Sequence, residues 1–389
     1  MKILSIETSC DETAISILEA EGDILNPSFT LLGNALFSQI DLHREYGGVY
    51  PTLAKREHSK NLVPLLETAL KDAKIETLSC EKYDLEKIKE TLTREEGLYE
   101  KLKEFLEKFG NKKPNIDLIV VTKGPGLAPA LWVGVSFAKA LSLAWGIKVI
   151  GENHMKGHIA SVLNVKKLNE KTEENKINFP SIALLISGGH TEIVYMENWA
   201  NFQIIGQTLD DAIGEAFDKT ARMLGLPYPG GPEVSKKAKE ARDENVEKRV
   251  DLPRPMLKSE TLDFSFSGLK TAVLYTIQKK EILDEEFIKD ICREFEDAVT
   301  EVLIRKTEKA LIESNAKTLI IGGGVISNSY IRENFQKLIN EKFKEVRLLI
   351  ADKKLATDNA VMIAMAGYIS HLSNKTSEEI KADGNLKLG

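Results

Sequence analysis

The run SIALLISGGHTEIVY occupies residues 181–195 of the 389-residue chain. Five consecutive apolar residues at 182–186 are followed by the polar, glycine-containing run SGGH at 187–190. A second strand-like run, TEIVY, starts at residue 191. A short apolar run bounded by glycine indicates a buried strand, and the polar interruption indicates a turn into a second strand. We therefore predict a β-hairpin whose turn carries polar groups.

A second hairpin of the same kind starts the chain, where residues 2–18 read KILSIETSCDETAISIL. Helix-like and strand-like segments alternate after each hairpin, for example the helix-like run 129–145 after the first and the helix-like run 284–314 after the second. Such alternation predicts an α/β lobe, and its repetition predicts two lobes. The length agrees, since one hydrophobic core rarely organises more than about 300 residues.

The expected N-terminal lobe covers residues 1–160 and the expected C-terminal lobe covers residues 180–357, while the last helix, at about 358–373, returns to the first lobe. Residues 81–113 are more than half charged, with apolar residues at helical spacing, and are predicted to be a solvated helical insertion. The polar segment 164–178 is predicted to be a loop, and the tail after residue 373 is expected to fray.

The composition is 42% hydrophobic and 29% charged, with a mean hydropathy of -0.20, which excludes disordered, collagen-like and membrane-spanning classes. The longest apolar windows fall short of the roughly 18 residues expected of a membrane span, and no secretory signal is readable. Three scattered cysteines argue against disulfides and for a reducing, cytoplasmic location. The net charge of -6 disfavours a protein that holds nucleic acid through bulk positive charge, so a local basic patch would be needed.

Two histidines, His154 and His158, lie four residues apart, a spacing that puts both imidazoles on one face of a helix and within reach of one metal ion. Asp358, at the start of an apolar helix, is the third candidate ligand, although a carboxylate there could equally serve as a helix cap. Met155 stands where a zinc peptidase carries its general-base glutamate, which argues against peptidase chemistry.

Glycine-rich turns follow predicted strands at 124–126, 187–189 and 322–324. Each could expose backbone N–H groups to a phosphate, and the three together predict a nucleotide cleft between the two lobes. The acidic stretch at 210–219 is expected to place Asp211, Glu215 and Asp218 on one face of a helix. This face could bind ribose hydroxyls or an ammonium group, or it could simply be exposed to solvent. 

A covalent nucleophile is poorly supported. No G-x-S-x-G motif occurs, and Cys10, beside two carboxylates, should have a raised thiol pKa.

Taken together, the motifs resemble the family of bacterial and mitochondrial tRNA N6-adenosine threonylcarbamoyltransferases, TsaD. The resemblance runs in family order over nearly the whole chain outside the two insertions. It rests on IETSCDET at 6–13, GPGL at 124–127, HMKGH at 154–158, LISGGHT at 185–191, GEAFDKT at 214–220, YPGGP at 228–232, DFSFSGLK at 263–270 and TDNA at 357–360.

The resemblance implies a duplicated actin/sugar-kinase/Hsp70-like (ASKHA) α/β fold, with a nucleotide cleft between two lobes. It implies one divalent metal per subunit, Fe2+ or Zn2+, held by His154, His158 and Asp358. The substrate residues that it implies are Leu185, Ile186, Ser187, Gly188, Gly189, Asp218, Gly231 and Asn328.

The implied reaction moves a threonylcarbamoyl group from threonylcarbamoyl-AMP to N6 of adenosine 37 in tRNAs that read codons starting with A. The donor is already a mixed anhydride, so a Lewis-acid metal and backbone hydrogen-bond donors suffice without an enzyme nucleophile. Asp11 or Glu12 is the predicted proton acceptor. The resemblance also implies a small paralogous partner (TsaB) and a P-loop ATPase (TsaE).

The chain departs from the family pattern at Lys156, where a glutamate is usual, and at Ile326, where a small residue is usual. Two alternatives stay open, an ATP-dependent phosphotransferase of the same fold and a non-catalytic paralogous scaffold, and a third, a metallopeptidase, fails on Met155. The phosphotransferase has no use for the two histidines and the distant aspartate. A silent scaffold would be expected to lose these residues, and the metallopeptidase lacks its general base.

Overall fold

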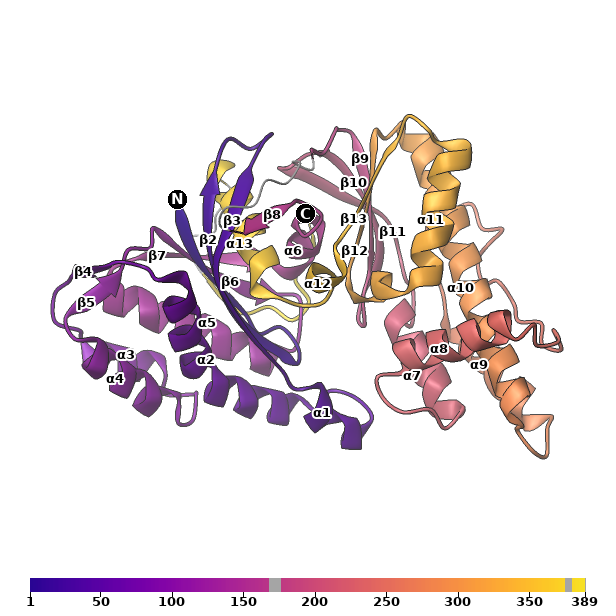
Figure 1. Ribbon diagram of the computed structural model, residues 1–389, viewed down its shortest axis with the longest axis horizontal. Coiled ribbons are helices and arrows are strands. Elements are labelled where there is room, and N and C mark those ends of the chain that lie inside the picture. The colour runs from indigo at the N-terminus through magenta and orange to yellow at the C-terminus, as the bar shows by residue number, and fades with distance from the viewer. Residues whose placement is uncertain (168–175, 375–379, 389) are drawn as a thin grey trace. The chain divides into compact units, whose positions relative to one another are not determined.

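The computed structural model describes residues 1–167, 176–374 and 380–388 (Figure 1). Its packing divides the chain into two units. Unit 1 comprises Met1–Lys176 and Asp358–Leu388, and unit 2 comprises Ile177–Thr357. The C-terminal helix therefore belongs to the same unit as the N-terminal hairpin.

Unit 1 is built on a six-stranded sheet. Its strands are β1 (Lys2–Glu7), β2 (Glu12–Glu21), β3 (Ser28–Ser38), β6 (Leu118–Gly124), β7 (Lys148–Asn153) and β8 (Val165–Lys167), in the order β7-β6-β1-β2-β3-β8. β1 and β2 form the predicted antiparallel hairpin, and β6 pairs with β1 in parallel. β1 and β6 are almost wholly buried, which explains why they read as continuous apolar runs rather than as alternating patterns.

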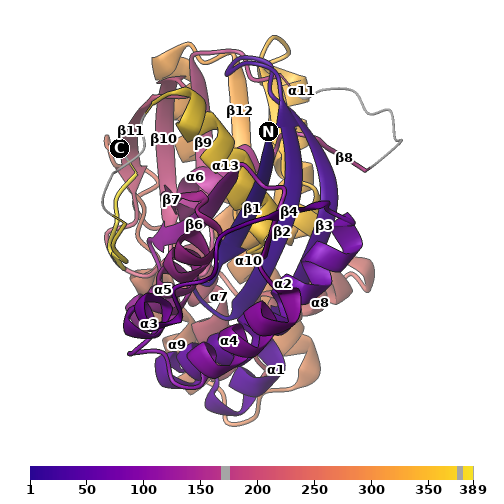
Figure 2. The same ribbon diagram turned by 90° about the vertical axis from the view of Figure 1, so that its left-hand side faces the viewer.

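Helices cover both faces of this sheet (Figures 1 and 2). α2 (Pro51–Ala73) and α5 (Ala128–Trp145) pack on one face, and α13 (Ala360–Leu372) and the short α6 (His154–Ala160) on the other. The expectation that no segment is long enough to span a membrane was wrong for α5, whose 18 residues are sufficiently apolar. Because 67% of that window is buried, α5 is explained as a core helix of unit 1.

The charged segment 81–113 is part of the core rather than a solvated excursion. It follows the strand β4 (Thr77–Ser79), forms α3 (Leu85–Thr91) and α4 (Leu98–Phe109), and ends within β5 (Lys112–Pro114), which pairs with β4 in a two-stranded ribbon. Its apolar residues recur every three or four positions, so one face of each helix is buried while the charges point outward. The buried side chains that join the core of unit 1 are Ile88, Leu92, Leu98, Leu102, Phe105 and Leu106.

Two further expectations need correction. The segment 164–178 contains β8, which pairs in parallel with β3, while residues 168–175 lie outside the described chain. Residues 380–388 of the tail do not fray, because their backbone finds partners on the turn at 124–126. The N–H of Asp383 donates to the Lys123 carbonyl (2.7 Å), and the N–H of Gly126 donates to the Gly384 carbonyl (3.1 Å).

Unit 2 repeats the topology of unit 1. Its strands are β9 (Ser181–Ile186), β10 (Thr191–Asn198), β11 (Asn201–Gln207), β12 (Thr318–Gly322) and β13 (Arg347–Ile350), in the order β11-β10-β9-β12-β13. β9 and β10 form the second predicted hairpin, and β12 pairs with β9 in parallel, as β6 does with β1. The order β13-β12-β9-β10-β11 therefore matches β7-β6-β1-β2-β3, and the fold is a duplication.

Helices fill the rest of unit 2. They are α7 (Ile213–Met223), α8 (Gly230–Asp243), α9 (Ser267–Gln278), α10 (Glu285–Ser314), α11 (Ser329–Lys342) and α12 (Lys353–Ala356), with a 3-10 turn at Gly324–Ser327. α8 packs along α10, and α11 also contacts α10, so the longest helix of the unit supports both neighbours.

A buried histidine network fixes the first hairpin turn. The ring Nε2–H of His58 on α2 donates to the Cys10 carbonyl (3.0 Å), so its Nδ1 accepts the Thr13 hydroxyl (2.7 Å). His43, on the short α1 (Ile40–His43), is likewise buried, and its Nδ1 accepts the backbone N–H of Tyr50 (3.2 Å). Burial lowers the pKa of His58 to about 4, so this ring is neutral at physiological pH.

Gly367 on α13 tests how closely that helix approaches the sheet. A methyl group at Gly367 would lie 2.5 Å from Cγ1 of Val120 on β6, whereas one at Gly268 on α9 would meet no described atom within 4 Å. We expect Gly367→Ala to destabilise the fold by about 1–3 kcal/mol through overpacking. Gly268→Ala, the matched control, should be neutral or stabilising by up to about 1 kcal/mol. Urea unfolding measures both, and equal effects would contradict the close approach.

The low pKa of His58 makes stability depend on pH. The unfolded chain, with an ordinary histidine pKa of 6.5, binds a proton between pH 6.5 and 4 that the folded chain does not. Stability is thus fully present above pH 6.5 and is lost as the pH falls toward 4. We expect the wild type to lose about 1 kcal/mol more than His58→Gln between pH 7.5 and 5.5.

Urea unfolding at the two pH values gives this difference. His371→Gln, at a partly exposed histidine of α13, is the control and should keep the wild-type pH dependence. An identical pH dependence in wild type and His58→Gln would contradict the assignment.

Candidate metal and nucleotide sites

The two histidines of the HMKGH motif and Asp358 meet within unit 1. Asn153 caps α6, accepting the N–H groups of Met155 (2.8 Å) and Lys156 (3.3 Å), so the helix starts at His154. One turn later His158 lies on the same face, and the Nε2 atoms of His154 and His158 are each 3.3 Å from Oδ1 of Asp358. The three ligand atoms lie within 4.8 Å of one another.

Asp358 is not the helix cap that remained possible from the sequence. The neighbouring Asn359 caps α13 instead, its Oδ1 accepting the N–H of Met362 (2.9 Å). The carboxylate of Asp358 is therefore left to face the two histidines. Burial by itself would raise the pKa of Asp358, but the adjacent His154 and His158 hold it well below the ordinary value.

A buried glutamate that sequence reasoning missed holds His154 from its other side. Glu7, at the end of β1, places Oε2 3.1 Å from Nδ1 of His154 and accepts the Thr122 hydroxyl (2.5 Å) and the N–H of Ser9 (2.5 Å). Burial alone would lower the pKa of His154, but the carboxylates of Asp358 and Glu7 raise it well above the ordinary value. With a proton on Nδ1 directed at Glu7, the Nε2 lone pair of a neutral His154 faces Asp358.

The pKa of His158 is shifted in the opposite direction from that of His154. Its ring is fully buried, and this burial lowers its pKa, which favours the neutral ring that a metal ligand requires. Its Nδ1 has no hydrogen-bond partner in the described chain, so that atom can keep the proton while Nε2 serves as a ligand. Two neutral imidazoles and one carboxylate form a donor set that suits Zn2+ or Fe2+.

The predicted proton acceptors are also in unit 1: Asp11 lies on the turn between β1 and β2, and Glu12 is the first residue of β2. Asp11 and Glu12 both have raised pKa values, caused first by burial; for Glu12 the neighbouring Asp11 carboxylate adds to the effect. A carboxylate with a raised pKa is the stronger base once it is ionised. The predicted rise for the Cys10 thiol is confirmed, since burial and the adjacent carboxylates raise its pKa well above the ordinary value.

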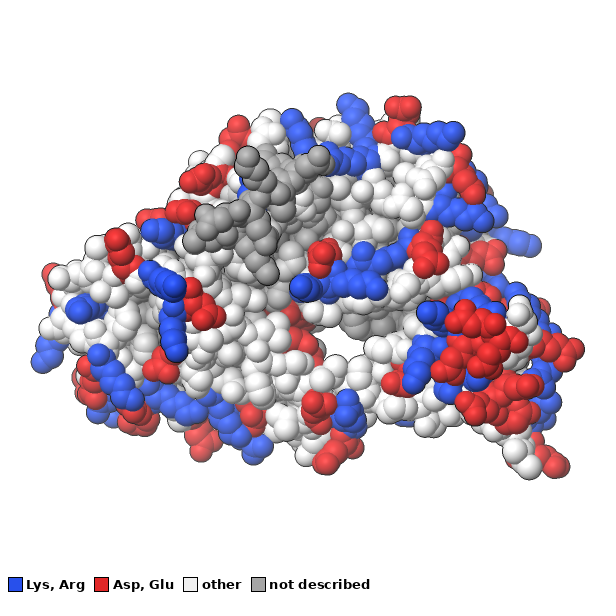
Figure 3. Space-filling view, in the orientation of Figure 1, with Lys and Arg blue, Asp and Glu red and all other residues white. Residues whose placement is uncertain are grey.

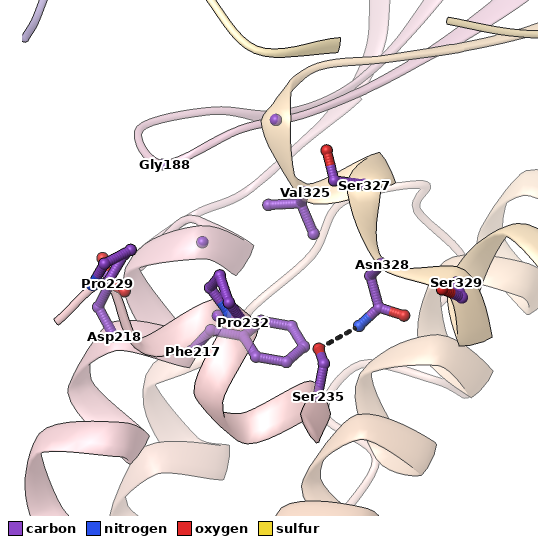
Figure 4. A pocket seen from close by; sticks show the side chains of 13 residues that line it. Gly188, Phe217, Asp218, Pro229, Pro232, Ser235, Val325, Ser327, Asn328 and Ser329 are labelled. Carbon is purple, nitrogen blue, oxygen red and sulfur yellow. Dashed lines mark hydrogen bonds between the residues drawn. The ribbon is translucent and has the colours of Figure 1, made fainter. Parts of the chain in front are cut away.

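Unit 2 contains a cavity of about 360 Å³. Figure 4 shows the Gly188 turn and the Val325–Ser327 segment on one side of it and Phe217, Pro232 and Ser235 on the other. The residues that line it are Gly188, Gly214, Phe217, Asp218, Pro229, Gly231, Pro232, Ser235, Gly324, Val325, Ser327, Asn328 and Ser329.

Half of the eight predicted substrate residues line this cavity: Gly188, Asp218, Gly231 and Asn328. Ser187 and Gly189 flank Gly188 on the hairpin turn, where the Ser187 hydroxyl oxygen accepts the N–H of His190. Leu185 and Ile186 are buried residues of β9, and their side chains do not reach the cavity. The unusual Ile326 is buried in the 3-10 turn, and Asn328 still lines the cavity beside it.

The glycine turns have different roles. A methyl group at Gly188, Gly231 or Gly324 would meet no described atom within 4 Å, so the backbone there is open to a ligand. A methyl group at Gly124, by contrast, would lie 1.9 Å from the Asp383 carbonyl, because the C-terminal tail occupies that turn. The turn at 124–126 is therefore a packing site, whereas the turns at 187–189 and 322–324 border one cavity through the open Gly188 and Gly324.

The three acidic side chains of the stretch at 210–219 do not share one environment. Asp218 lines the cavity and accepts the N–H of Gly230 (2.7 Å), while burial raises its pKa. Asp211 and Glu215 instead pair with Lys219, at 2.6 and 2.7 Å. The expected common face does not form, because α7 begins only at Ile213, after Asp211.

Sequence reasoning also missed Ser235 and Phe217 in the cavity wall. Ser235 lies four residues after Gly231 on α8, so its place on the same helix face could have been predicted from the period of the helix.

Comparison with known proteins identifies the family to which the chain is similar. The family model described as TsaD, tRNA N6-adenosine threonylcarbamoyltransferase, matches residues 30–82 and 95–365. Curated relatives of that name include one from Thermosipho africanus (strain TCF52B), 42% identical over all of both chains. Another, from Persephonella marina (strain DSM 14350 / EX-H1), is 40% identical over all of this chain and 95% of its own.

Among solved structures, full-length HypF in its phosphate- and nucleotide-bound form matches 96% of this chain and 46% of its own, with 12% identity and a TM-score of 0.50. This likeness concerns the fold alone, which is the predicted ASKHA type. The interruption of the family match at residues 83–94 falls on the helical insertion. The match over nearly the whole chain and the close relatives show that this chain belongs to the TsaD family, the tRNA N6-adenosine threonylcarbamoyltransferases.

Proposed function

We propose that this chain transfers the threonylcarbamoyl group of threonylcarbamoyl-AMP to N6 of adenosine 37 in tRNAs that read codons starting with A. The observation that carries the proposal is the family match, whose residues include both the His154–His158–Asp358 cluster and the cavity bordered by open glycines. Membership of the family makes tRNA the substrate.

The cavity of unit 2 is suited to the nucleotide part of the donor. Its volume is within the range of about 300–1,000 Å³ that is usual for small-molecule sites. The open backbone at Gly188 and Gly324 allows close approach of a phosphate, and Asp218 and Ser235 offer a carboxylate and a hydroxyl to ribose. The apolar Phe217, Pro232 and Val325 supply surfaces against which a base can pack.

The donor set of unit 1 fits a divalent metal, and we propose that His154, His158 and Asp358 hold one Fe2+ or Zn2+. Such a metal supplies a Lewis acid for a carbonyl or phosphate oxygen. Glu7 orients His154 by accepting a hydrogen bond from its Nδ1–H.

The transfer itself forms a bond between N6 of adenine and the carbamoyl carbon and breaks the bond between that carbon and the phosphate oxygen, so AMP leaves. The leaving group is already activated, so no enzyme nucleophile is needed, in keeping with the raised pKa of Cys10. The proton released from N6 passes to Asp11 or Glu12, whose raised pKa values suit a proton acceptor.

We further propose that a TsaB-like paralogue and a TsaE-like P-loop ATPase act with this chain in the cytoplasm. The three free cysteines support a reducing compartment. Figure 3 shows Lys and Arg interspersed with Asp and Glu on the visible face, with no broad basic field there. Together with the net charge of -6, this favours tRNA binding that is shared with partner proteins.

Reconstitution tests the reaction. The chain, its partners, a synthase that supplies the adenylate, ATP, threonine, carbonate and unmodified tRNA are combined, and the nucleosides are analysed by mass spectrometry. We expect threonylcarbamoyladenosine with the wild type and with the control His371→Ala, but at least about 100-fold less with His154→Ala and His158→Ala together. No product with the wild type, or undiminished product with the double variant, would overturn the proposal.

Metal analysis tests the ligand set separately from activity. We expect about one equivalent of bound metal in the wild type and none in the double histidine variant. Glu7→Gln, which leaves all three ligands in place, should weaken the metal affinity by about 10–100-fold in a chelator competition. Wild-type affinity in Glu7→Gln would exclude the orienting role of Glu7.

A further inference from the structure

The side-chain amide of Asn328 is held in one orientation by groups of unit 2. Its Nδ2 donates to the Ser235 hydroxyl oxygen (2.7 Å) and to Oε1 of Glu296 (2.6 Å), while its Oδ1 accepts the N–H of Ile331 (3.0 Å) and so caps α11. Figure 4 shows Asn328 and Ser235 pointing toward one another at the edge of the cavity. Both N–H bonds of the amide are therefore used within the protein.

Glu296 determines which way this amide faces. An ionised carboxylate only accepts hydrogen bonds, so Asn328 must present its Nδ2 to Glu296 and direct its Oδ1 elsewhere. The Ser235 hydroxyl oxygen then accepts a hydrogen bond from Asn328, which leaves the O–H of Ser235 available to donate to a ligand. Glu296 is 1% exposed and does not itself line the cavity.

A second set of contacts holds Glu296 in place. Its Oε2 accepts Nη1 of Arg242 (2.5 Å), and Nη2 of the same guanidinium donates to Asp297 (2.6 Å). The guanidinium also lies 3.5 Å from the centre of the Tyr330 ring. Arg242 is near the end of α8, the helix whose first turns carry Gly231 and Ser235, so Glu296 links α8, α10 and α11 around the cavity.

We propose that Glu296 is a positioning residue for the nucleotide site. Its Oε1 fixes the amide of Asn328, and through it the hydroxyl of Ser235, so that the O–H of Ser235 is presented to the nucleotide as a donor. This inference rests on the proposed function, which assigns the nucleotide to this cavity.

Three variants separate positioning from mere support of the fold. Glu296→Ala removes the acceptor for Asn328, whereas Glu296→Gln keeps an oxygen acceptor and removes the charge. Asp297→Asn is the matched control, because Asp297 also pairs with Arg242 but makes no hydrogen bond to Asn328. In calorimetric titration of the full chain with AMP, we expect affinity at least tenfold weaker for Glu296→Ala, within threefold of wild type for Glu296→Gln and within twofold for Asp297→Asn.

Thermal melting provides the second readout. Both Glu296 variants break the charge pair with Arg242 and should lower Tm together, while only the alanine variant loses affinity. In an Asn328→Ala background, Glu296→Ala should change the AMP affinity by less than twofold. If Glu296→Ala does not fold, Glu296→Asp replaces it, because it keeps the charge but withdraws the acceptor by one methylene group.

The outcomes are distinguishable. A wild type that does not bind AMP overturns the nucleotide assignment of the cavity and the inference with it. A wild type that binds AMP while Glu296→Ala, or its aspartate substitute, binds equally well overturns the inference alone. An affinity that follows Tm across the variants reduces Glu296 to a structural residue and also overturns it.

Discussion

The interaction on which the site of unit 1 depends is the set of hydrogen bonds made by one fully buried carboxylate, that of Glu7. It accepts hydrogen bonds from Ser9 in the following hairpin turn and from Thr122 on the neighbouring strand, and it contacts His154 at the start of α6. A buried charge is costly unless its neighbours satisfy it, so these three elements must adopt their observed register together. The hairpin, the parallel strand and the helix start are thus specified by the same group.

The duplication gives the two units one topology but different chemistry. In unit 1 His154, His158 and Asp358 bring their ligand-type atoms within 4.8 Å of one another, and in unit 2 the open Gly188 and Gly324 border a cavity of about 360 Å³. A buried glutamate orients a site side chain in each: Glu7 faces His154, and Glu296 faces Asn328. The backbone of each unit therefore sets the positions of the site side chains, while the buried carboxylates of Glu7 and Glu296 set the orientations of His154 and Asn328.

Patterns of short range predicted much of this structure. Apolar runs around glycine predicted both hairpins, and the period of the helix brought His154 and His158 together. Contacts between residues far apart in the sequence were harder to predict from the sequence. The capping of α13 by Asn359 rather than Asp358, and the capture of Asp211 and Glu215 by Lys219, depend on side-chain competition that spacing does not reveal. The helix α4 was expected to be solvated because it holds as many charged as apolar residues, although a single apolar face is enough for burial.

The C-terminal segment braces the helix that carries both histidines. The amide Nδ2 of Asn153, the cap of that helix, donates to the carbonyl of Lys387 (3.2 Å), which is 234 residues away in the sequence. A contact of such long range forms only with the tertiary structure of unit 1. The positions of His154 and His158 are therefore set by the folded unit and not by the short helix α6 alone.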